Sequence, residues 1–330
     1  MKKLICALLC ALMALSALSF VACDQTPAEA DTLKFGMGVY TATPTVSDAT
    51  EEKNGSGKVA ITAAVITVDA DGKIVACQLD TMECSVAHTL DGKAIASNGF
   101  KTKGEQGADY GMVAYGGASK EWYEQADAFE TVVAGKTLDE IKALVAEGNK
   151  GTDEVVSAGC TIMVHEFVKA IEAAYGTLAD SSVTSEHTLK LGMHAEQTTA
   201  DATEEKDGSN QVEVSIFGAA VDADGKVVDS TTDCVQAKFT FDLTGKATLD
   251  TTKKISSKRQ AGADYGMVAY GGATKEWFEQ ADAFDTLCKG KTASQIAALV
   301  AADNYGTDDV KAAGCTILVN GLVKAAVKIG

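Results

Sequence analysis

The sequence has no excess of basic residues, no long apolar run beyond its first residues and none of the short motifs of the common enzyme classes. Lys and Arg number 29 against 46 Asp and Glu, which gives a net charge of −17 over 330 residues. Such a surface repels nucleic acid and anionic lipid headgroups, so nucleic acid is not an expected partner. No CxxC, P-loop, GxGxxG or nucleophile elbow is present, and hydrolase, kinase and dinucleotide-binding functions therefore lack support.

The N-terminus has the pattern of a secretion signal. Lys2 and Lys3 precede an apolar run over residues 4–22, and the run stops at Cys23. Phe20-Val21-Ala22-Cys23 resembles the lipobox of bacterial lipoproteins, in which the cysteine is acylated and becomes the first mature residue. The sequence thus predicts a lipid anchor on Cys23 at the extracytoplasmic face of the cell membrane. The alternative is a retained N-terminal helix that spans the bilayer.

The cysteines do not form a repeated disulfide framework. Cys6 and Cys10 leave with the signal, and Cys23 is taken by lipid. Six others remain, and only two of these, Cys160 and Cys315, occupy equivalent places in the two halves of the chain; the six are Cys77, Cys84, Cys160, Cys234, Cys288 and Cys315. A framework required by the fold would recur, so disulfides are optional, and a Cys77–Cys84 bridge stays open.

The mature chain contains the same module twice. The segment GADYGMVAYGGA at 107–118 returns unchanged at 262–273, and AGCTI at 158–162 returns at 313–317. The segments DATEEK and KEW(Y/F)EQADAF recur as well. The predicted organisation is a signal peptide (1–22), a tether (23–31), a first module (32–175), a linker (176–187) and a second module (188–330).

Each module is expected to be α+β, with an antiparallel β-hairpin or sheet packed by helices that follow it in the chain. Residues 59–68 and 74–79 are strand-like, and the Asp-Gly segment 69–73 between them predicts a hairpin turn rather than a calcium loop. Helices are predicted for 119–133, capped by Ser119 and with an apolar stripe at Trp122, Ala126, Phe129 and Val133, for 138–146, capped by Thr137, and for about 163–174. Strands first and helices after favour α+β over a doubly wound sheet.

The repeated Gly-aromatic segment is the first candidate site. Its glycines allow close approach of the backbone to a ligand, and its aromatic and Met side chains suit the face of a flat ring. The candidate residues are Tyr110, Met112 and Tyr115 in the first module and Tyr265, Met267 and Tyr270 in the second. The alternative is that glycine supplies turns and the aromatics supply core. Trp122 and Trp277 are expected to be core, and Lys120, Glu121, Glu124, Gln125 and Asp127 to form a solvated helix face.

The repeated AGCTI segment is the second candidate site, with Cys160, Thr161, Cys315 and Thr316 as its residues. Each threonine is expected to open a helix, where a hydroxyl caps backbone N–H groups. The cysteine is interpreted either as packing or as a reactive thiol. His88, His165, His187 and His194 have no partner in the other module, so neither histidine catalysis nor a metal site is predicted.

The order of these features resembles the FMN-binding domain of exported flavoproteins. That family has a DGKI-like hairpin turn, as at 71–74 and 224–227, and a Ser-Gly-Ala-Thr motif whose threonine carries FMN through a phosphoester bond in many members. The resemblance implies this role for Thr161 and Thr316. Here Ala158 and Ala313 replace the family's serine, and Cys160 and Cys315 its alanine, which leaves open whether attachment is covalent. The KEWYEQADAF helix with the AGCT ending also resembles a group of clostridial lipoproteins.

These observations lead to one hypothesis and two rivals. The hypothesis is a lipid-anchored protein that binds one FMN in each module and passes electrons to redox partner proteins, as a carrier rather than a catalyst, with no catalytic residue of its own. The first rival is a surface lipoprotein that binds a small non-redox ligand in the same place. The second is a structural surface protein, which is favoured if the Gly-aromatic residues are buried core.

Overall fold

The computed structural model describes residues 32–248 and 254–330, which form one compact unit of α+β architecture. The predicted signal peptide, tether and acylated Cys23 lie outside the described residues. Within those residues, no helix has the length and apolar character needed to cross a membrane.

The first half of the chain (residues 32–175) folds into an antiparallel sheet followed by helices. Its sheet has the strand order β5-β4-β3-β1-β6, with β2 paired to β3. The strands are β1 Lys34–Thr41, β2 Thr45–Ser47, β3 Gly55–Val68, β4 Ile74–His88, β5 Ala94–Ile95 and, from the linker, β6 Ala179–Asp180. The helices are α1 Lys103–Gln106, α2 Trp122–Val133, α3 Leu138–Lys142, α4 Asp153–Ala158 and α5 His165–Tyr175, with 3-10 turns η1 Gly107–Tyr110 and η2 Glu147–Asn149.

The second half (residues 188–330) follows the same order of elements. Its antiparallel sheet is β7 Thr188–Ala200, β8 Gly208–Val221 and β9 Val227–Phe241. Its helices are α6 Lys258–Ala261, α7 Trp277–Cys288, α8 Ala293–Ala297, α9 Asp308–Ala312 and α10 Asn320–Ala326, with 3-10 turns η3 Gly262–Tyr265 and η4 Val327–Ile329.

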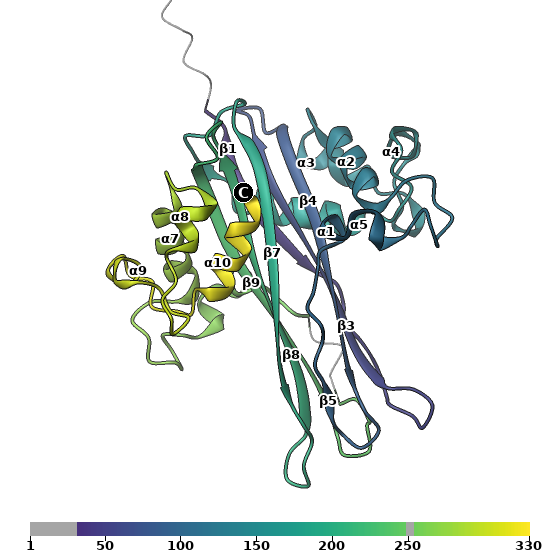
Figure 1. Ribbon diagram of the computed structural model, residues 1–330. Helices are drawn as coiled ribbons and strands as arrows, with labels where there is room; N and C mark the ends of the chain where they lie inside the picture. The colour runs from purple at the N-terminus through teal and green to yellow at the C-terminus, as the bar shows by residue number, and fades with distance from the viewer. Residues whose placement is uncertain (1–31, 249–253) are drawn as a thin grey trace, which may run out of the picture. The chain divides into compact units, whose positions relative to one another are not determined.

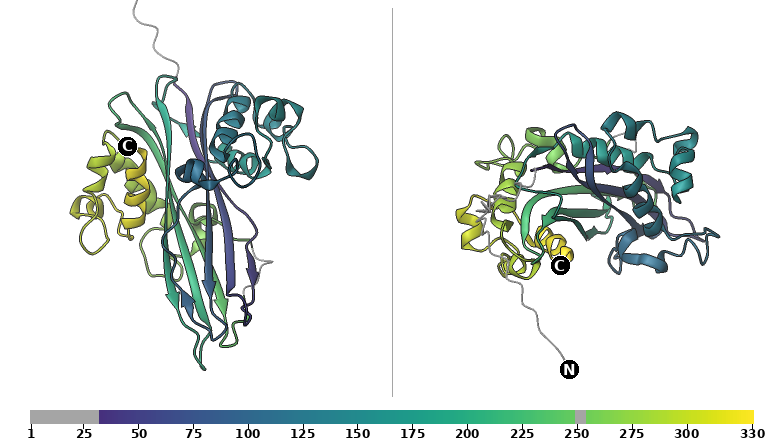
Figure 2. Two further views of the ribbon diagram at one scale, coloured as in Figure 1. Left: turned by 45° about the vertical axis from the view of Figure 1, so that its right-hand side comes forward. Right: turned by 90° about the horizontal axis from the view of Figure 1, so that it is seen from above.

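The two sheets lie face to face, and each carries its helices on the outer face (Figures 1 and 2). Strand β3 contributes side chains to two hydrophobic cores, one on each face of its sheet. Ile61, Ala63 and Val65 belong to the core between the sheets, whereas Ala64 and Ile66 face the helices of the first half. Successive strand residues point to opposite faces, so a strand covered on both sides reads as an unbroken apolar run.

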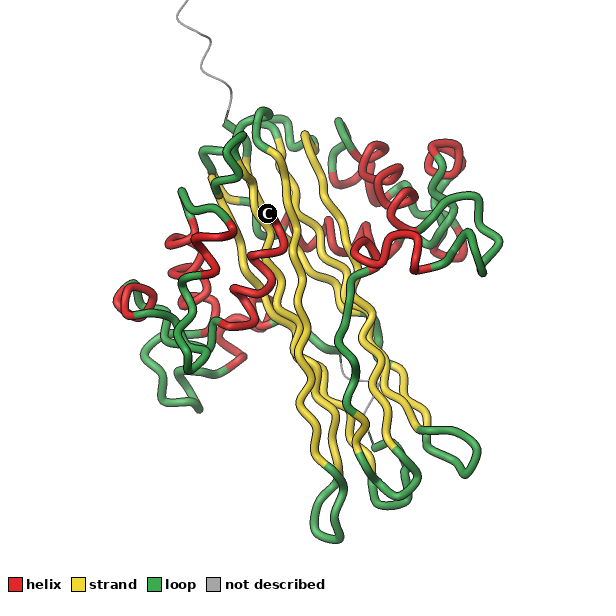
Figure 3. The backbone as a smooth tube through the Cα atoms, in the orientation of Figure 1, coloured by secondary structure: helices red, strands yellow, loops and turns green. Residues whose placement is uncertain are grey.

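Reciprocal hydrogen bonds join the hairpin ends of the two halves. The Ala49 N–H donates to the Gly245 carbonyl and the Ala202 N–H donates to the Gly92 carbonyl, both at 2.8 Å. Asp48 accepts from the Ala247 N–H at 2.8 Å, and its counterpart Asp201 accepts from Ala94 in the same way. The repeated DATEEK segment is therefore explained by these contacts between the halves. Figure 3 shows the strands continuing past the helices to these hairpins.

The predicted elements are present, with shifted ends. The hairpin turn is confirmed, because Asp69 accepts hydrogen bonds from the backbone of Asp71 and Lys73. Strand β4 is much longer than predicted, and β1 was not predicted at all. Helix α2 is capped by Glu121 instead of Ser119, and α3 ends at Lys142 rather than at 146.

The six described cysteines are free thiols. The Cys77–Cys84 bridge does not form, because both residues lie on strand β4. Seven positions along a strand correspond to roughly 23 Å, which is far beyond the reach of a disulfide.

Candidate functional site

One helix in each half ties the two repeated segments together. Glu121, the N-cap of α2, accepts hydrogen bonds from the backbone N–H groups of Met112 (2.9 Å) and Val113 (3.1 Å) in the Gly-aromatic segment. Glu276 holds the Met267 and Val268 N–H groups in the second half at 2.9 and 3.2 Å. Both carboxylates are buried, so the loop backbone is their main partner.

One turn further along, a buried glutamine holds the AGCTI segment. Gln125 Oε1 accepts from the backbone N–H of Thr161 at 2.8 Å and from its hydroxyl at 2.9 Å. Gln280 makes the same two bonds to Thr316 at the same distances. The predictions of a solvated face are wrong for Glu121 and Gln125. Their recurrence four residues apart, on one helix face, was the signal that sequence reasoning missed.

The threonines do not open a helix. Helix α4 ends at Ala158 with Gly159 as its C-cap, and α5 begins only at His165, so Thr161 lies in the turn between them. The φ of Gly159 is +105°, a backbone conformation that residues with a side chain rarely adopt, which explains the glycine. The predicted capping role is therefore replaced by the bond to Gln125.

The neighbouring cysteines are packing residues in this geometry. Cys160 and Cys315 are fully buried. Burial raises the pKa of each thiol to about 11, so the thiolate needed for reaction is scarce near neutral pH. The reactive-thiol interpretation is disfavoured.

The Gly-aromatic side chains divide into two kinds. Tyr115 and Tyr270 are 91% and 92% exposed, which excludes them from the core. Tyr110 and Met112 are partly buried against the helices, as is Met267 in the second half. The expectation that Trp122 and Trp277 are core holds, because each is only 4% exposed.

A lysine that sequence reasoning did not single out lies between these rings. In the second half, Lys258 Nζ is 5.4 Å from the ring centre of Tyr265 and 5.5 Å from that of Trp277. Lys103 is placed in the same way in the first half, 5.1 Å from the Tyr110 ring and 5.9 Å from the Trp122 ring. These distances are within the range of cation–π attraction.

A cavity of about 550 Å³ opens beside these groups in the second half. Tyr265, Met267 and Trp277 line it together with Lys258, and Thr316 of the AGCTI turn and Gln280 of α7 line it as well. Three of the predicted site residues, Tyr265, Met267 and Thr316, thus meet in one place. Tyr270 and Cys315 are not part of the lining.

The acidic residues of the cavity each face an ammonium group. Glu213 lies 3.3 Å from Lys258, and Glu196 lies 2.7 Å from Lys324. Burial lowers the pKa of Lys258, but surrounding negative groups, Glu213 among them, outweigh burial and raise the pKa above its ordinary value. The cavity therefore keeps a charged ammonium at its aromatic wall.

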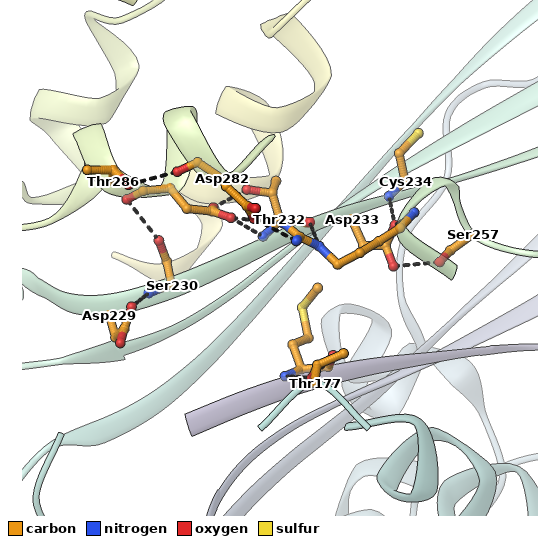
Figure 4. Close-up of polar contacts among 12 residues, drawn as sticks. Thr177, Asp229, Ser230, Thr232, Asp233, Cys234, Ser257, Asp282 and Thr286 are labelled. Carbon is orange, nitrogen blue, oxygen red and sulfur yellow. Dashed lines mark hydrogen bonds and ion pairs between the residues drawn. The ribbon is translucent and has the colours of Figure 1, made fainter. Parts of the chain in front are cut away.

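A buried polar network fixes the helix that carries Lys258 (Figure 4). Asp233 on β9 accepts from the Ser257 hydroxyl at 2.6 Å and from the Arg259 N–H at 3.1 Å. The Arg259 guanidinium lies 3.2 Å from Asp285 on α7. Residues on both sides of Lys258 are thus anchored to the sheet and to α7, which sets the position of its side chain.

Gln280→Met is expected to lower the free energy of unfolding by about 0.5–1.5 kcal/mol, because the Thr316 N–H and hydroxyl lose their shared acceptor. Hydrogen exchange at the Thr316 amide would rise as the turn loosens. Urea unfolding and amide exchange measure the two effects. Gln125→Met is the matched variant in the first half, and unchanged exchange at Thr316 in Gln280→Met would contradict the assigned contact.

Comparison with known proteins gives one partial similarity. The chain is 32% identical over 108 residues to chlorophenol reductase of Desulfitobacterium hafniense. The similar region covers 29% of this chain and 33% of that protein, so the chain spans about a third of the length of this curated relative. No protein-family model matches the sequence, and no solved structure matches it.

Proposed function

We propose that the protein is an exported, lipid-anchored flavin-binding protein that transfers electrons outside the cytoplasm. The observation that carries the proposal is the second-half cavity, where the Gly-aromatic segment and the Gly-Cys-Thr turn meet. Both halves preserve these two segments. The export signal, the resemblance to the FMN-binding domain and the partial similarity to a reductase support the same proposal.

The residues of the cavity fit an FMN molecule. A volume of about 550 Å³ lies within the roughly 300–1,000 Å³ of cofactor pockets. Tyr265, Trp277 and Met267 offer apolar and aromatic surface for a flat ring, and the Lys258 ammonium suits the electron-rich edge of that ring. Thr316 is exposed and hydrogen-bonded to Gln280, so its oxygen faces the cavity side of the turn.

Bound flavin would supply the redox chemistry, and the chain would bind, orient and tune it. Trp277 and Met267 would orient the ring, and Lys258 would favour negative charge on it. Thr316 would hold the phosphate end, by a hydrogen bond or by a phosphoester. These roles need no repeated histidine, and the protein acts as an electron carrier in this proposal.

Visible absorption and intact mass of protein purified from its own membranes test the proposal. We expect flavin absorption, and an added FMN mass after denaturation if the bond is covalent. For protein without bound flavin, titration with FMN is expected to quench flavin fluorescence. Absence of chromophore, added mass and quenching would reject the proposal, and stabilisation by non-flavin compounds alone would favour a non-redox ligand.

Lys258→Met is expected to weaken FMN binding by about tenfold. The substitution keeps the apolar stem of the side chain and removes only its charge, and Glu213 is exposed enough to be solvated once it loses its partner. Fluorescence titration measures the dissociation constant. Lys103→Met removes the corresponding charge from the first half, outside the cavity, and is expected to change the constant less than about twofold. Equal effects of the two variants would contradict the role of Lys258.

A further inference from the structure

We infer that the two halves are unequal and that only the second half binds flavin, because Gly321 leaves space that Glu166 fills in the first half. The inference rests on the proposed function and goes beyond it, since the preserved motifs by themselves predict one ligand per half. It concerns a residue outside both preserved segments.

Glu166 and Gly321 occupy the same place in their halves. Each is the second residue of the helix that follows the AGCTI turn, α5 in the first half and α10 in the second. Val164 and Val319 precede these helices as N-cap residues with nearly the same backbone angles. Glu166 and Gly321 are therefore structurally equivalent positions.

In the second half, the absence of a side chain at Gly321 brings α10 close to the sheet. A Cβ at this position would lie 2.5 Å from the hydroxyl oxygen of Ser215 on β8. Gly321 and Ser215 both line the cavity. A side chain at position 321 would therefore press on Ser215 and extend into the cavity that both residues line beside the Thr316 turn.

In the first half, the carboxylate of Glu166 occupies the matching space. Its Oε2 lies 3.5 Å from the hydroxyl of Thr62, the residue of β3 that corresponds to Ser215. Thr62 is fully buried and is bonded to Thr81 at 2.9 Å, so it gives Glu166 a fixed neighbour. A carboxylate here also repels the phosphate of FMN, which the neutral Gly321 does not.

Two further positions next to this one also differ between the halves. Tyr305 lines the second-half cavity, whereas Lys150 stands in its place in the first half. Asn320 lines the cavity too, and its counterpart His165 lies edge-on to the Tyr40 ring, with 6.4 Å between ring centres. In the first half an ammonium thus stands where the second half has an aromatic ring, and His165 packs against Tyr40.

Counting the FMN bound per chain tests the inference on the full-length protein. We expect one FMN per chain for the native sequence, by absorbance after equilibrium dialysis. Gly321→Glu, which reproduces the arrangement already present in the first half, is expected to weaken binding by more than about 100-fold, since side chain and ring compete for one space. Glu166→Gln, the matched change in the first half, is expected to retain one FMN per chain.

Gly321→Gln separates size from charge and is expected to lose binding as well. Circular dichroism and thermal unfolding establish that each variant is folded. Two FMN per chain, or one FMN retained by folded Gly321→Glu, would overturn the inference while leaving the proposed function standing. No FMN on the native protein, before or after reconstitution, would overturn both.

Discussion

Gly192→Val is expected to lower the free energy of unfolding by about 3 kcal/mol or more. Gly192 lies on β7 directly beneath α10, and a Cβ there would sit 2.1 Å from the carbonyl oxygen of Ala325. That atom is helix backbone, which cannot rotate away as a flexible side chain would. The variant must therefore push α10 off the sheet and open the core of the second half.

Urea unfolding followed by circular dichroism measures this loss. Ala200→Val is the control, because it adds the same kind of side chain at an exposed position of the same strand. Its effect is expected to stay within about 0.5 kcal/mol. If Gly192→Val unfolds at the same urea concentration as the control, the close approach of β7 and α10 is wrong.

The native protein is expected to lose stability as pH rises because of Glu130. The Glu130→Gln variant is expected not to show this loss. Burial raises the pKa of Glu130 from 4.5 to about 8, against the opposing hydrogen bond from the Leu79 N–H. Above pH 4.5 the folded state then keeps a proton that the unfolded state releases. Stability consequently falls between about pH 4.5 and 8, at up to about 1.4 kcal/mol per pH unit.

The glutamine keeps the acceptor oxygen for the Leu79 N–H and cannot ionise. We therefore expect similar stability of variant and native protein near pH 5 and a more stable variant near pH 9. Thermal unfolding over this range measures the difference. A variant that follows the native pH profile would show that Glu130 is not the group responsible.

Asp285 provides the matched comparison, since it holds the corresponding place on α7. Burial raises its pKa to about 7, but Arg259 lies 3.2 Å away and opposes the shift. Asp285→Asn at pH 8 removes the buried carboxylate of this pair and leaves the partly buried Arg259 guanidinium paired with the more exposed Asp282. The expected change in the free energy of unfolding is therefore opposite in sign to that of Glu130→Gln, namely a loss of about 3 kcal/mol. Equal signs would contradict the role of Arg259.

The sequence indicated some residues of the candidate site and not others. Recurrence of the Gly-aromatic and AGCTI segments singled out Tyr265, Met267 and Thr316, which the structure brings to one cavity. The recurrence of Gln280 did not distinguish it from the exposed residues of the same repeated helix, because glutamine on a helix is usually solvated. The burial of Gln280 depends on a turn that follows it by 36 positions, and helical periodicity is a short-range property.

The register of the first strand in each half is a second feature that the repeated sequence did not reveal. Lys34 and Lys190 stand at the same place in the repeated Thr-Leu-Lys segment, yet Lys34 pairs with Val68 and Lys190 with Ala219, the counterpart of Ile66. The shift of two residues places a glycine under the helix in both halves. Gly38 approaches the Ala170 carbonyl as Gly192 approaches that of Ala325. Packing against the helix, not the motif, selects the register.

The sequence alone determined the α+β class, the hairpin turn at 69–73, the capping of α3 by Thr137 and the buried stripe of α2. These features depend on residues close together in the chain, where propensity and periodicity act. Only the tertiary structure decided that the two sheets share one core, that Gln280 holds Thr316, and that Gly321 lines a cavity whereas Glu166 contacts Thr62. Each of these depends on which distant residues come into contact, and that is a property of the packed chain rather than of any segment of it.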